Sequence, residues 1–433
     1  MNRSLHVAAV QLRAHDRAVF TQTLPAILDQ IAEAANGAEL VVVPEGTFPA
    51  YVLGSEPVDR GAIETAVEAL RDVARRTQTV LVAGVATAGG ELPRNAALVI
   101  DRDGTVAGRA DKLFLWHFDR RWFEAGDCVA PVQTSIGTLG AFVCADGRIP
   151  TIARELVDRG AEILVMPTAW VTSGRNPDSL ENVQADLLAR VRARENGVPF
   201  VAANKCGAEL GMVAYCGKSQ IVDAAGVVVA IAPEREAVIV KAVVEVGDPQ
   251  PFRRPVALPA PRATVADTPV RVAISFDPLP VDLEERLAIL DDGYAIAPGS
   301  PERFIALDRI VPTIEAGDDD VLDPAGLVGY RRAGYRLFVW ATSGEPAWVE
   351  RMARARALEL RLYAIVLSRT ERRAYAVDPD GVVVCGTFGD FTLASFSLDP
   401  RKTTDTIVAP GTDVHDGLGR IAGLIRREEV TPL

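Results

Sequence analysis

Three side chains of this sequence could act together on one carbonyl or nitrile carbon: Glu45, Lys112 and Cys144. Cys144 ends the apolar run 139–143 and is followed by Ala-Asp-Gly and then by a helical pattern of apolar residues. A strand, a sharp turn and a helix present the side chain at the turn to a crevice, beside free backbone N–H groups. A thiol at this place is a candidate nucleophile, although a free cysteine at a strand end is also commonly an inert core residue.

The chemistry of these residue types is that of a cysteine amidohydrolase. A thiol near its free pKa of about 8.5 is mostly un-ionised at neutral pH, so a base must remove its proton. Burial of Glu45 would raise the pKa of its carboxyl toward the range useful for that base. The ammonium of Lys112 and a backbone N–H of the turn could stabilise the negative charge that forms on the substrate heteroatom. Taken singly, Glu45 also fits a solvated loop acid and Lys112 a surface charge.

The elements that must position these residues alternate between strand and helix patterns as far as residue 245. Glu45 follows a buried strand predicted at 39–44, and Lys112 follows a hairpin predicted at 96–109. Further strands are predicted at 6–12, 79–85, 162–167, 199–204, 217–222, 227–232 and 237–245, and helices at 24–35, 63–76, 151–159 and 180–194. This alternation indicates an α/β layered sheet fold with helices on its outer faces.

The chain of 433 residues exceeds one typical core, so we expect two domains. The character of the sequence changes near residue 247, where a stretch with few large apolar residues begins. Prolines recur there at positions 249, 251, 255, 259, 261 and 269. Such a stretch is typical of a stiff, extended linker. We therefore predict a first domain over 1–248, a linker over 249–269 and a second domain over 270–433.

The sequence of the second domain resembles a degenerate copy of the first. The matched segments are 271–275 with the opening strand, 293–299 with 38–45, 333–340 with 159–166, and 377–384 with 222–229. These matches place Gly299 opposite Glu45 and Asp318 opposite Cys144, and they leave Lys112 without a counterpart. The second domain would then have the fold of the first without its catalytic residues. The alternative is chance similarity between Val- and Ala-rich segments.

Composition narrows the function classes. A net charge of −12 disfavours nucleic acid and anionic membranes as partners, and we expect a small-molecule substrate. Five scattered cysteines without a CxxC argue against a disulfide framework and a zinc site, and favour a reducing, cytoplasmic setting. The four histidines form no ligand motif, so neither a metal nor another cofactor is expected. No run of residues has the length and apolarity of a membrane helix, and the N-terminus has no signal-peptide pattern.

Over about residues 5–245 the sequence resembles the nitrilase superfamily of carbon–nitrogen hydrolases. The motifs are Val-Val-Pro-Glu45-Gly, Asp-Lys112-Leu-Phe-Leu and Phe-Val-Cys144-Ala-Asp-Gly-Arg-Ile-Pro, in the family's order and spacing. The resemblance implies an αββα sandwich for the first domain, and the internal repeat then predicts a smaller, degenerate and inactive copy of that fold in the second. It also implies Glu45 as general base and then acid, Lys112 as stabiliser of the tetrahedral intermediate, and Cys144 as nucleophile through a thioester. The N–H of Ala145 would complete the oxyanion site.

The sequence departs from the family pattern in places. Many members carry a second glutamate after the lysine, and the match puts Asp119 there, where its shorter side chain could still orient Lys112 or the leaving amine. Nitrile hydrolases of the family tend to have Trp-Glu after the cysteine. Ala145 and Asp146 look more like the amidase and carbamoylase branches, so the resemblance favours an amide or N-carbamoyl substrate over a nitrile.

Further residues could line the substrate pocket. Trp116, Arg148 and Trp170 are candidates beside Ala145, and each has an equally good structural explanation. Two other functions stay open: an acyltransferase that passes the Cys144-bound acyl group to an amine, and an inactive binding or scaffold protein. We also expect either a homo-oligomer or a pseudo-dimer that the two domains of one chain would form.

Overall fold

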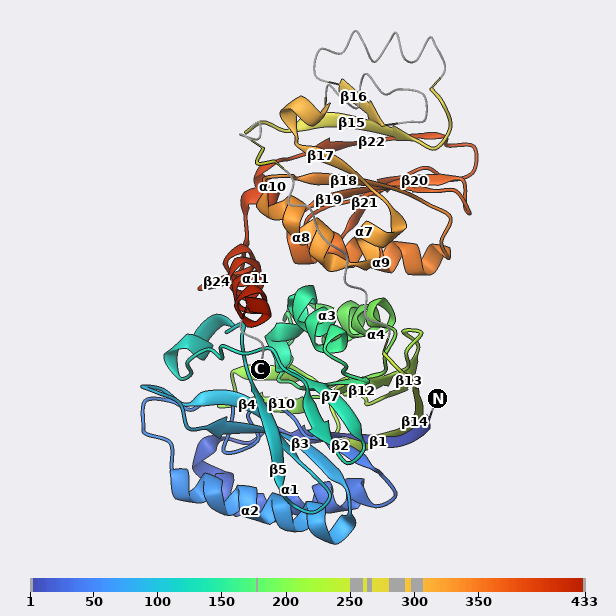
Figure 1. The fold of residues 1–433 in the computed structure, drawn as a ribbon. Helices are drawn as coiled ribbons and strands as arrows, with labels where there is room; N and C mark the ends of the chain where they lie inside the picture. Colours follow the sequence, from blue (N-terminus) through green and yellow to red (C-terminus); the bar gives the residue numbers. More distant parts are fainter. Residues whose placement is uncertain are drawn as a thin grey trace. The chain divides into compact units, whose positions relative to one another are not determined.

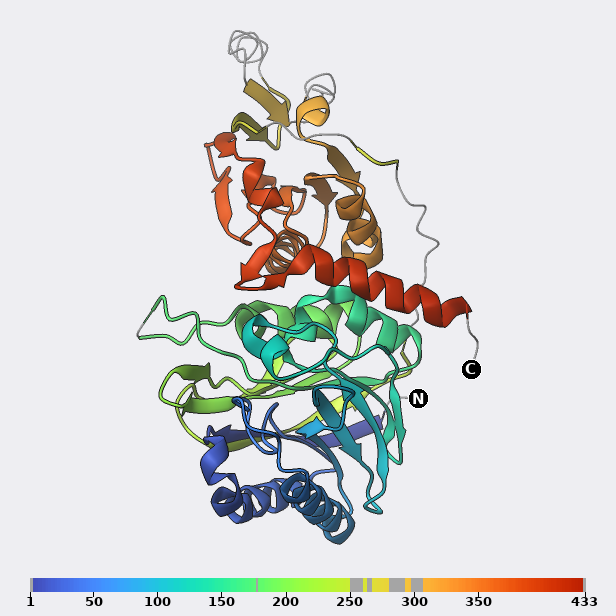
Figure 2. The same cartoon turned by 90° about the vertical axis from the view of Figure 1, so that its left-hand side faces the viewer.

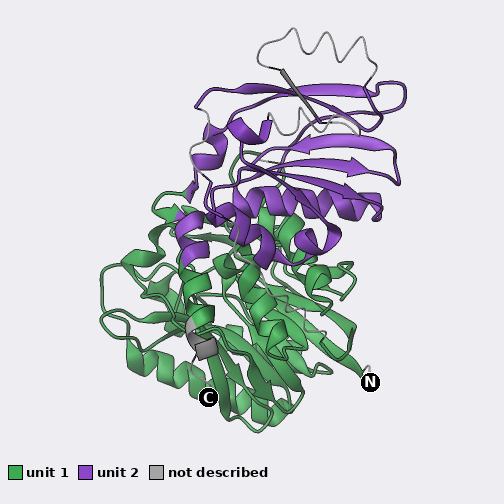
Figure 3. Ribbon diagram, turned by 45° about the horizontal axis from the view of Figure 1, so that its top comes forward, with its two compact units in different colours: residues 1–253, 409–412, 420–433 green, residues 254–408, 413–419 purple. Residues whose placement is uncertain are grey.

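The computed structural model describes residues 3–176, 178–249, 260–262, 267–279, 293–296 and 307–430. Most of the predicted linker 249–269, together with Gly299, lies outside these residues. The chain divides into two compact units, shown in Figure 3. The first comprises Met1–Arg253, Ala409–Thr412 and Arg420–Leu433, and the second Arg254–Val408 and Asp413–Gly419. Within the described part of the chain, no helix is long and apolar enough to cross a membrane.

Two mixed sheets form the centre of the first unit. In one sheet, β1, β2 and β3 run parallel to one another, and β14 pairs antiparallel with β1. Its strands in spatial order are β11 (Val213–Cys216), β10 (Lys205–Glu209), β1 (Arg3–Arg13), β2 (Leu40–Val42), β3 (Val80–Thr87), β4 (Arg94–Ile100) and β5 (Val106–Asp111), with β14 (Val238–Val246) beside β1. The carboxyl ends of β1, β2 and β3 therefore point the same way, and Glu45 follows the end of β2.

In the second sheet of this unit, β7, β8 and β9 are parallel. Its strands in spatial order are β13 (Val228–Ile231), β12 (Gln220–Val222), β9 (Phe200–Ala203), β8 (Ile163–Pro167), β7 (Gly137–Ala141) and β6 (Val132–Thr134). Cys144 follows β7 at the carboxyl end of these parallel strands. A backbone hydrogen bond joins the segments that follow β2 in the first sheet and β8 in the second. In it the N–H of Glu45 donates to the carbonyl of Thr168 at 3.2 Å.

Helices cover the outer faces of both sheets (Figures 1 and 2). The helices α1 (Phe20–Ala35) and α2 (Arg60–Thr77) lie on the outer side of the sheet that holds β2. The helices α3 (Pro150–Asp158) and α4 (Ala189–Asn196) lie on the outer side of the other. The resulting four layers confirm the αββα sandwich predicted from the sequence.

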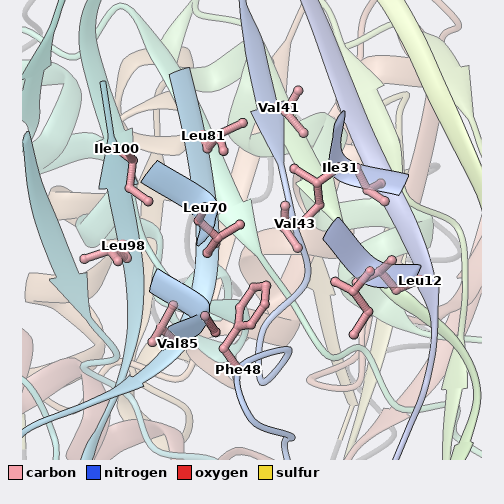
Figure 4. Packing of buried hydrophobic residues seen from close by; sticks show 14 of the residues in the cluster. Leu12, Ile31, Val41, Val43, Phe48, Leu70, Leu81, Val85, Leu98 and Ile100 are labelled. Atoms are coloured by element: carbon pink, nitrogen blue, oxygen red, sulfur yellow. The ribbon is translucent and has the colours of Figure 1, made fainter. Parts of the chain in front are cut away.

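The helix α2 shows how the apolar pattern produces this layer. Its buried residues Ile63, Ala66, Leu70 and Val73 recur at helical spacing, and Asp59 caps its start by accepting a bond from the N–H of Ala62 at 3.1 Å. Together with α1 and the sheet it forms a core of apolar residues. Figure 4 labels some of its members: Leu12, Ile31, Val41, Val43, Phe48, Leu70, Leu81, Val85, Leu98 and Ile100. Burying each such side chain contributes roughly 1.5–3 kcal/mol, which makes this layer a firm support for the strand ends.

The second unit contains a three-stranded and a five-stranded sheet. The first has the order β16 (Gly293–Ile296), β15 (Val270–Ser275) and β22 (Leu393–Leu398). The second has the order β17 (Thr313–Ala316), β18 (Leu337–Thr342), β19 (Tyr363–Ser368), β20 (Arg373–Val377) and β21 (Val383–Gly386). The helices of this unit that are described from end to end are α7 (Asp318–Leu322), α8 (Pro324–Arg332), α9 (Pro346–Leu360) and α10 (Arg401–Thr404). The chain continues through β23 (Ile407–Ala409), β24 (Thr412–Asp413) and α11 (Val414–Val430).

Strand directions in the second unit repeat those of the first. β17, β18 and β19 are parallel and β20 and β21 follow antiparallel, as β7, β8, β9, β12 and β13 do. Likewise, β15 pairs parallel with β16 and antiparallel with β22, as β1 does with β2 and β14. The strands of the second unit can therefore be matched one to one with strands of the first.

Candidate active site

Glu45 is fully buried and is held by the strand next to its own. The strand β3 passes so close that a Cβ on Gly84 would lie 2.4 Å from both Glu45 Cα and Pro44 O. On the adjoining strand β4, the amide of Asn95 donates to Glu45 Oε1 at 2.6 Å. The carboxylate is thus fixed by backbone packing on one side and by a side-chain amide on the other.

Lys112 directly follows β5, and its ammonium lies between two carboxylates. Its Nζ is 2.7 Å from Glu45 Oε1 and 2.7 Å from Asp119 Oδ2, and all three side chains are buried. Burial lowers the pKa of Lys112, but the charges of Asp119, Glu45 and Cys144 raise it, and the net pKa lies well above its usual value. Lys112 is therefore a charged ammonium inside the fold.

Asp119 reaches this ammonium from the short 3₁₀ helix η2 (His117–Arg121). Its carboxylate accepts the N–H of Trp116 at 2.8 Å and the hydroxyl of Tyr51 at 2.7 Å. Burial raises the pKa of Tyr51 well above its usual value, and the charges of Asp119 and Glu45 raise it further. Tyr51 is thus a permanent hydrogen-bond donor, which the sequence did not single out.

Cys144 occupies the turn after β7 in a strained backbone conformation. Its φ is +45°, a region that residues other than glycine rarely adopt and that is common at functional sites. Burial raises the pKa of the Cys144 thiol and the charge of Glu45 raises it further, whereas Lys112, Thr168 and the backbone of Ala169 oppose this. The thiol therefore lies within the electrostatic reach of both Glu45 and Lys112, and it is un-ionised at neutral pH.

Asp146 ties the turn of the thiol to the segment that carries the ammonium. It accepts the N–H of Val143 at 3.1 Å, of Leu113 at 3.0 Å and of Phe114 at 2.7 Å. Burial raises the pKa of this carboxyl to about 7, although the three backbone N–H groups lower it. Its bridging position depends on segments that lie far apart in the chain, so no local signal in the sequence could indicate it.

The predicted pocket residues have mixed surroundings. The guanidinium of Arg148 lies 4.3 Å from the ring centroid of Trp116, and Ala145 is buried beside Cys144 in the same turn. The backbone N–H of Trp170 donates to Asn204 Oδ1 at 2.8 Å. The indole Nε1 of Trp170 is buried and finds no hydrogen-bond partner in the described part of the chain. The contact of these residues with a substrate stays a prediction.

A cavity of about 620 Å³ lies elsewhere on the first unit, between the 53–58 loop, the start of α2 and the connection from β3 to β4. The predicted catalytic and substrate-binding residues are not among those that line it. Among the residues that the structure describes, no group of three or more His, Cys, Asp or Glu side chains could hold a metal ion. The candidate site is therefore identified by its buried charges and its strained cysteine.

Comparison with known proteins agrees with the family resemblance found in the sequence. Residues 6–254 match the sequence model of the family described as carbon-nitrogen hydrolase. A probable nitrilase of Schizosaccharomyces pombe is 31% identical over 160 residues, which span 37% of this chain and 56% of that protein. A citrullinase of Francisella tularensis is 26% identical over 240 residues, or 52% of this chain and 82% of the citrullinase. The crystal structure of an amidase from Nesterenkonia sp. matches with a TM-score of 0.50 at 28% identity, over 56% of this chain and 89% of the amidase.

Proposed function

The chain belongs to the carbon–nitrogen hydrolase family of enzymes, and we propose that its first unit cleaves a non-peptide C–N bond through a thioester on Cys144. The observation that carries this proposal is the unequal use of the Glu45 carboxylate. Its Oε1 accepts bonds from Lys112 and Asn95, whereas Oε2 is buried and lacks a hydrogen-bond partner among the described residues. A free carboxylate oxygen in a buried site is a suitable proton acceptor for a nearby thiol.

The reaction would begin with proton transfer from the Cys144 thiol to Glu45. The sulfur attacks the substrate carbon, and the negative charge forms on the carbonyl oxygen. Lys112 and the N–H of Ala145 would stabilise that oxyanion, and one such donor contributes on the order of 3 kcal/mol. Glu45 then gives its proton to the leaving nitrogen, the C–N bond breaks, and an acyl thioester remains on Cys144.

Deacylation would use the same carboxylate in reverse order. Glu45 takes a proton from water, the resulting hydroxide attacks the thioester carbon, and the thiol leaves after it regains the proton. Asp119 supports both halves, because it and Glu45 hold the Lys112 ammonium from two sides. In this role Asp119 orients the ammonium and keeps it charged.

We propose an amide or an N-carbamoyl compound as the substrate, in preference to a nitrile. The similarity to a citrullinase and to an amidase supports this choice, since ureido and amide groups share a carbonyl carbon bound to nitrogen. The similarity to a probable nitrilase keeps nitriles in the test panel. Transfer of the acyl group to an amine is the second candidate, because the same thioester would serve either acceptor.

The second unit, in our proposal, is a degenerate copy without chemistry of its own. Leu139 pairs with Ile163 and Thr313 pairs with Leu337 between the corresponding strands, so an ungapped match places Asp318 opposite Cys144. Asp318 accepts a bond from the indole of Trp340 at 2.8 Å. A carboxylate in the place of the thiol cannot form a thioester.

Similar arginine contacts in the two units support the same alignment of the second unit with the first. In the first unit Arg192 donates to the carbonyl of Gly147 at 3.0 Å and pairs with Glu195 at 2.6 Å. In the second, Arg356 donates to the carbonyl of Val321 at 2.8 Å and pairs with Glu359 at 2.8 Å. The ungapped match that aligns Asp318 with Cys144 also aligns Val321 with Gly147. We infer that the supports of the turn were kept and its nucleophile was not.

Ammonia release from a panel of amides, ureido acids and nitriles tests the proposal. The full chain should release ammonia from at least one amide or ureido acid, and Cys144→Ala should abolish this release. Cys385→Ala, a matched change in the second unit, should leave it unchanged. Ammonia release by Cys144→Ala at the wild-type rate would contradict the proposal, and release that requires an added amine would favour acyl transfer.

A further inference from the structure

A second buried ion pair lies close to the candidate site and has no part in the mechanism described so far. Lys205 and Glu209 lie on β10, with Nζ and Oε1 2.5 Å apart and both side chains fully buried. The desolvation of two charges generally offsets their attraction, so a buried ion pair is weak support for stability. The hydrogen bonds that Lys205 and Glu209 make to other residues indicate a different role for the pair.

The pair binds both ends of the segment 46–52, which directly follows Glu45. Lys205 Nζ donates to the carbonyl of Gly46 at 2.7 Å. Glu209 accepts the N–H of Val52 at 2.9 Å and, more weakly, that of Tyr51 at 3.4 Å. Two opposite charges on one strand thus fix a carbonyl at one end of the segment and N–H groups at the other.

The segment itself has little freedom between these anchors. Gly46 has a φ of +56°, and a Cβ on it would lie 2.5 Å from the Cα of Tyr51. The ring of Tyr215 also packs against Tyr51, with ring centroids 6.4 Å apart, and Lys205 lies 5.2 Å from the centroid of Tyr215. The backbone turn and the aromatic contact both place Tyr51 relative to the ion pair.

Tyr51 connects this arrangement to the buried charges. Its hydroxyl donates to Asp119 Oδ1 at 2.7 Å, and Asp119 Oδ2 contacts Lys112 at 2.7 Å. At the other end of the segment, Gly46 is the residue next to Glu45. A displacement of 46–52 would therefore move the Glu45 carboxylate and remove one hydrogen bond from Asp119 in the same step.

We propose that Lys205 and Glu209 are positioning residues, which hold the segment 46–52 so that Glu45 and Tyr51 keep Lys112 and Asp119 in a reactive arrangement. This inference rests on the proposed function. Positioning predicts a defect in the transition state, because misplacing a reacting group by about 1 Å can lower a rate on the order of 100-fold. Neither Lys205 nor Glu209 is among the residues proposed to contact the substrate. Substrate affinity should therefore change much less than the rate.

The test compares steady-state kinetics of the full chain with Lys205→Arg, Lys205→Met, Glu209→Gln and Glu359→Gln. Lys205→Met and Glu209→Gln should lower kcat on the order of 10- to 100-fold with KM nearly unchanged, the pattern of an interaction needed in the transition state. Lys205→Arg keeps the charge and should recover most of kcat. Glu359→Gln breaks the buried Arg356 pair of the second unit, at 2.8 Å in the intact chain, and should leave kcat and KM unchanged.

Hydrogen exchange of the backbone amides in 46–52 supplies a readout that does not need turnover. Exchange at Tyr51 and Val52 should become faster in Glu209→Gln and Lys205→Met, and stay slow in Lys205→Arg. Equal kinetics and equal exchange in Glu209→Gln and the wild type would overturn the inference, as would a Lys205→Arg chain as impaired as Lys205→Met. If the wild type turns over no substrate, the proposed function fails while the exchange result still decides the positioning role.

Discussion

Two carboxylates share one ammonium in the candidate site, and this imbalance sets the reactivity of the thiol. Glu45 and Asp119 both contact the ammonium of Lys112, so a thiolate on Cys144 would add a further negative charge to a buried site. Burial and Glu45 accordingly raise the pKa of Cys144. The residues thus favour a thiol that loses its proton to Glu45 during attack, over a thiolate formed in advance.

A prediction at this scale concerns Glu45→Gln. Removing the negative charge leaves Lys112 to favour the thiolate, so the pKa of Cys144 should fall and its alkylation at neutral pH should become faster. Turnover should nevertheless be lost, because glutamine cannot carry the proton. The pH dependence of iodoacetamide labelling, read by mass spectrometry on the Cys144 peptide, measures the change. Slower labelling in Glu45→Gln than in the wild type would contradict the charge balance described here.

Asp146 gives a second prediction, on pH and stability. Burial raises its folded pKa to about 7, whereas an unfolded aspartate titrates near about 3.9. Between these values the folded chain keeps a proton that the unfolded chain has released. Its contribution to the unfolding free energy is therefore full below about pH 4 and is lost as pH rises through about 7.

The thermal midpoint of the wild type should accordingly fall, relative to that of Asp146→Asn, as pH rises through this window. Asp72→Asn, which removes an exposed carboxylate of α2, serves as the matched control and should run parallel to the wild type. A difference between wild type and Asp146→Asn that does not change with pH would refute the buried titration.

The candidate site residues could be predicted from the sequence where they lie in local motifs. Glu45, Lys112 and Cys144 stand close to strand ends in recognisable runs, Asp119 follows in the short helix η2, and the structure brings Glu45 and Asp119 into contact with Lys112. Asn95 and Tyr51 were not predicted, because an ordinary polar or aromatic side chain gains its role only from a partner far away in the chain.

At the scale of elements, the strands act as rigid supports whose spacing decides the geometry. The clearest case is β3, where Gly84 lets the backbone of Glu45 approach to within a distance that excludes any side chain. The φ of +45° at Cys144 is the counterpart in the other sheet, a strained turn that the flanking β7 and α3 hold in place. The site is thus built at the edges of two sheets and depends on close backbone packing.

Gly84→Ala tests this dependence. The added methyl would meet Glu45 Cα and Pro44 O, so the strand end must shift, and we expect destabilisation by about 1–3 kcal/mol with kcat/KM reduced on the order of 100-fold. Denaturant unfolding and steady-state kinetics measure the two effects. Gly61→Ala on α2, where the new Cβ would lie 3.5 Å from the nearest atom, should leave both unchanged or slightly raise stability. Wild-type kinetics in Gly84→Ala would contradict the close packing.

The sequence pattern located most of the elements but not all. The predicted helix 63–76 corresponds to α2 and the predicted strand 237–245 to β14, because their apolar residues recur with the period of the element. The strands β10 and β11 were not predicted. β10 begins with Lys205 and ends with Glu209, and two charges whose buried partners lie far away in the chain look like part of a loop in a single sequence.

At the scale of the whole molecule, two units of related topology carry different side chains at matching positions. The first holds the buried charges and the strained cysteine, and the second has a carboxylate in the matching turn with an indole donor against it. The proline-rich composition near residue 250 indicated the division, and the repeated strand order supports the internal copy. The domain boundary at 248 stays a prediction, since the segments 409–412 and 420–433 also group with the first unit.

This inequality predicts one reactive centre per chain. An amide electrophile or chloroacetamide should modify one residue per 433-residue chain while activity is lost in proportion, and that residue should be Cys144. The double variant Cys144→Ala with Asp318→Cys should remain inactive, because the sequence match leaves Lys112 without a counterpart in the second unit. Intact-mass spectrometry of the labelled chain provides the count. Two equivalents that both track activity, or activity restored by Asp318→Cys, would contradict a silent second unit.

The most direct measurement is to trap the acyl group on the enzyme during turnover. The full chain is mixed with an amide or ureido substrate, quenched in acid within the first turnovers, digested and analysed by mass spectrometry. We predict an acyl mass on the peptide containing Cys144, which forms and decays at rates compatible with turnover and is absent from Cys144→Ala. An acyl group on another residue, or hydrolysis that continues in Cys144→Ala, would contradict the thioester mechanism.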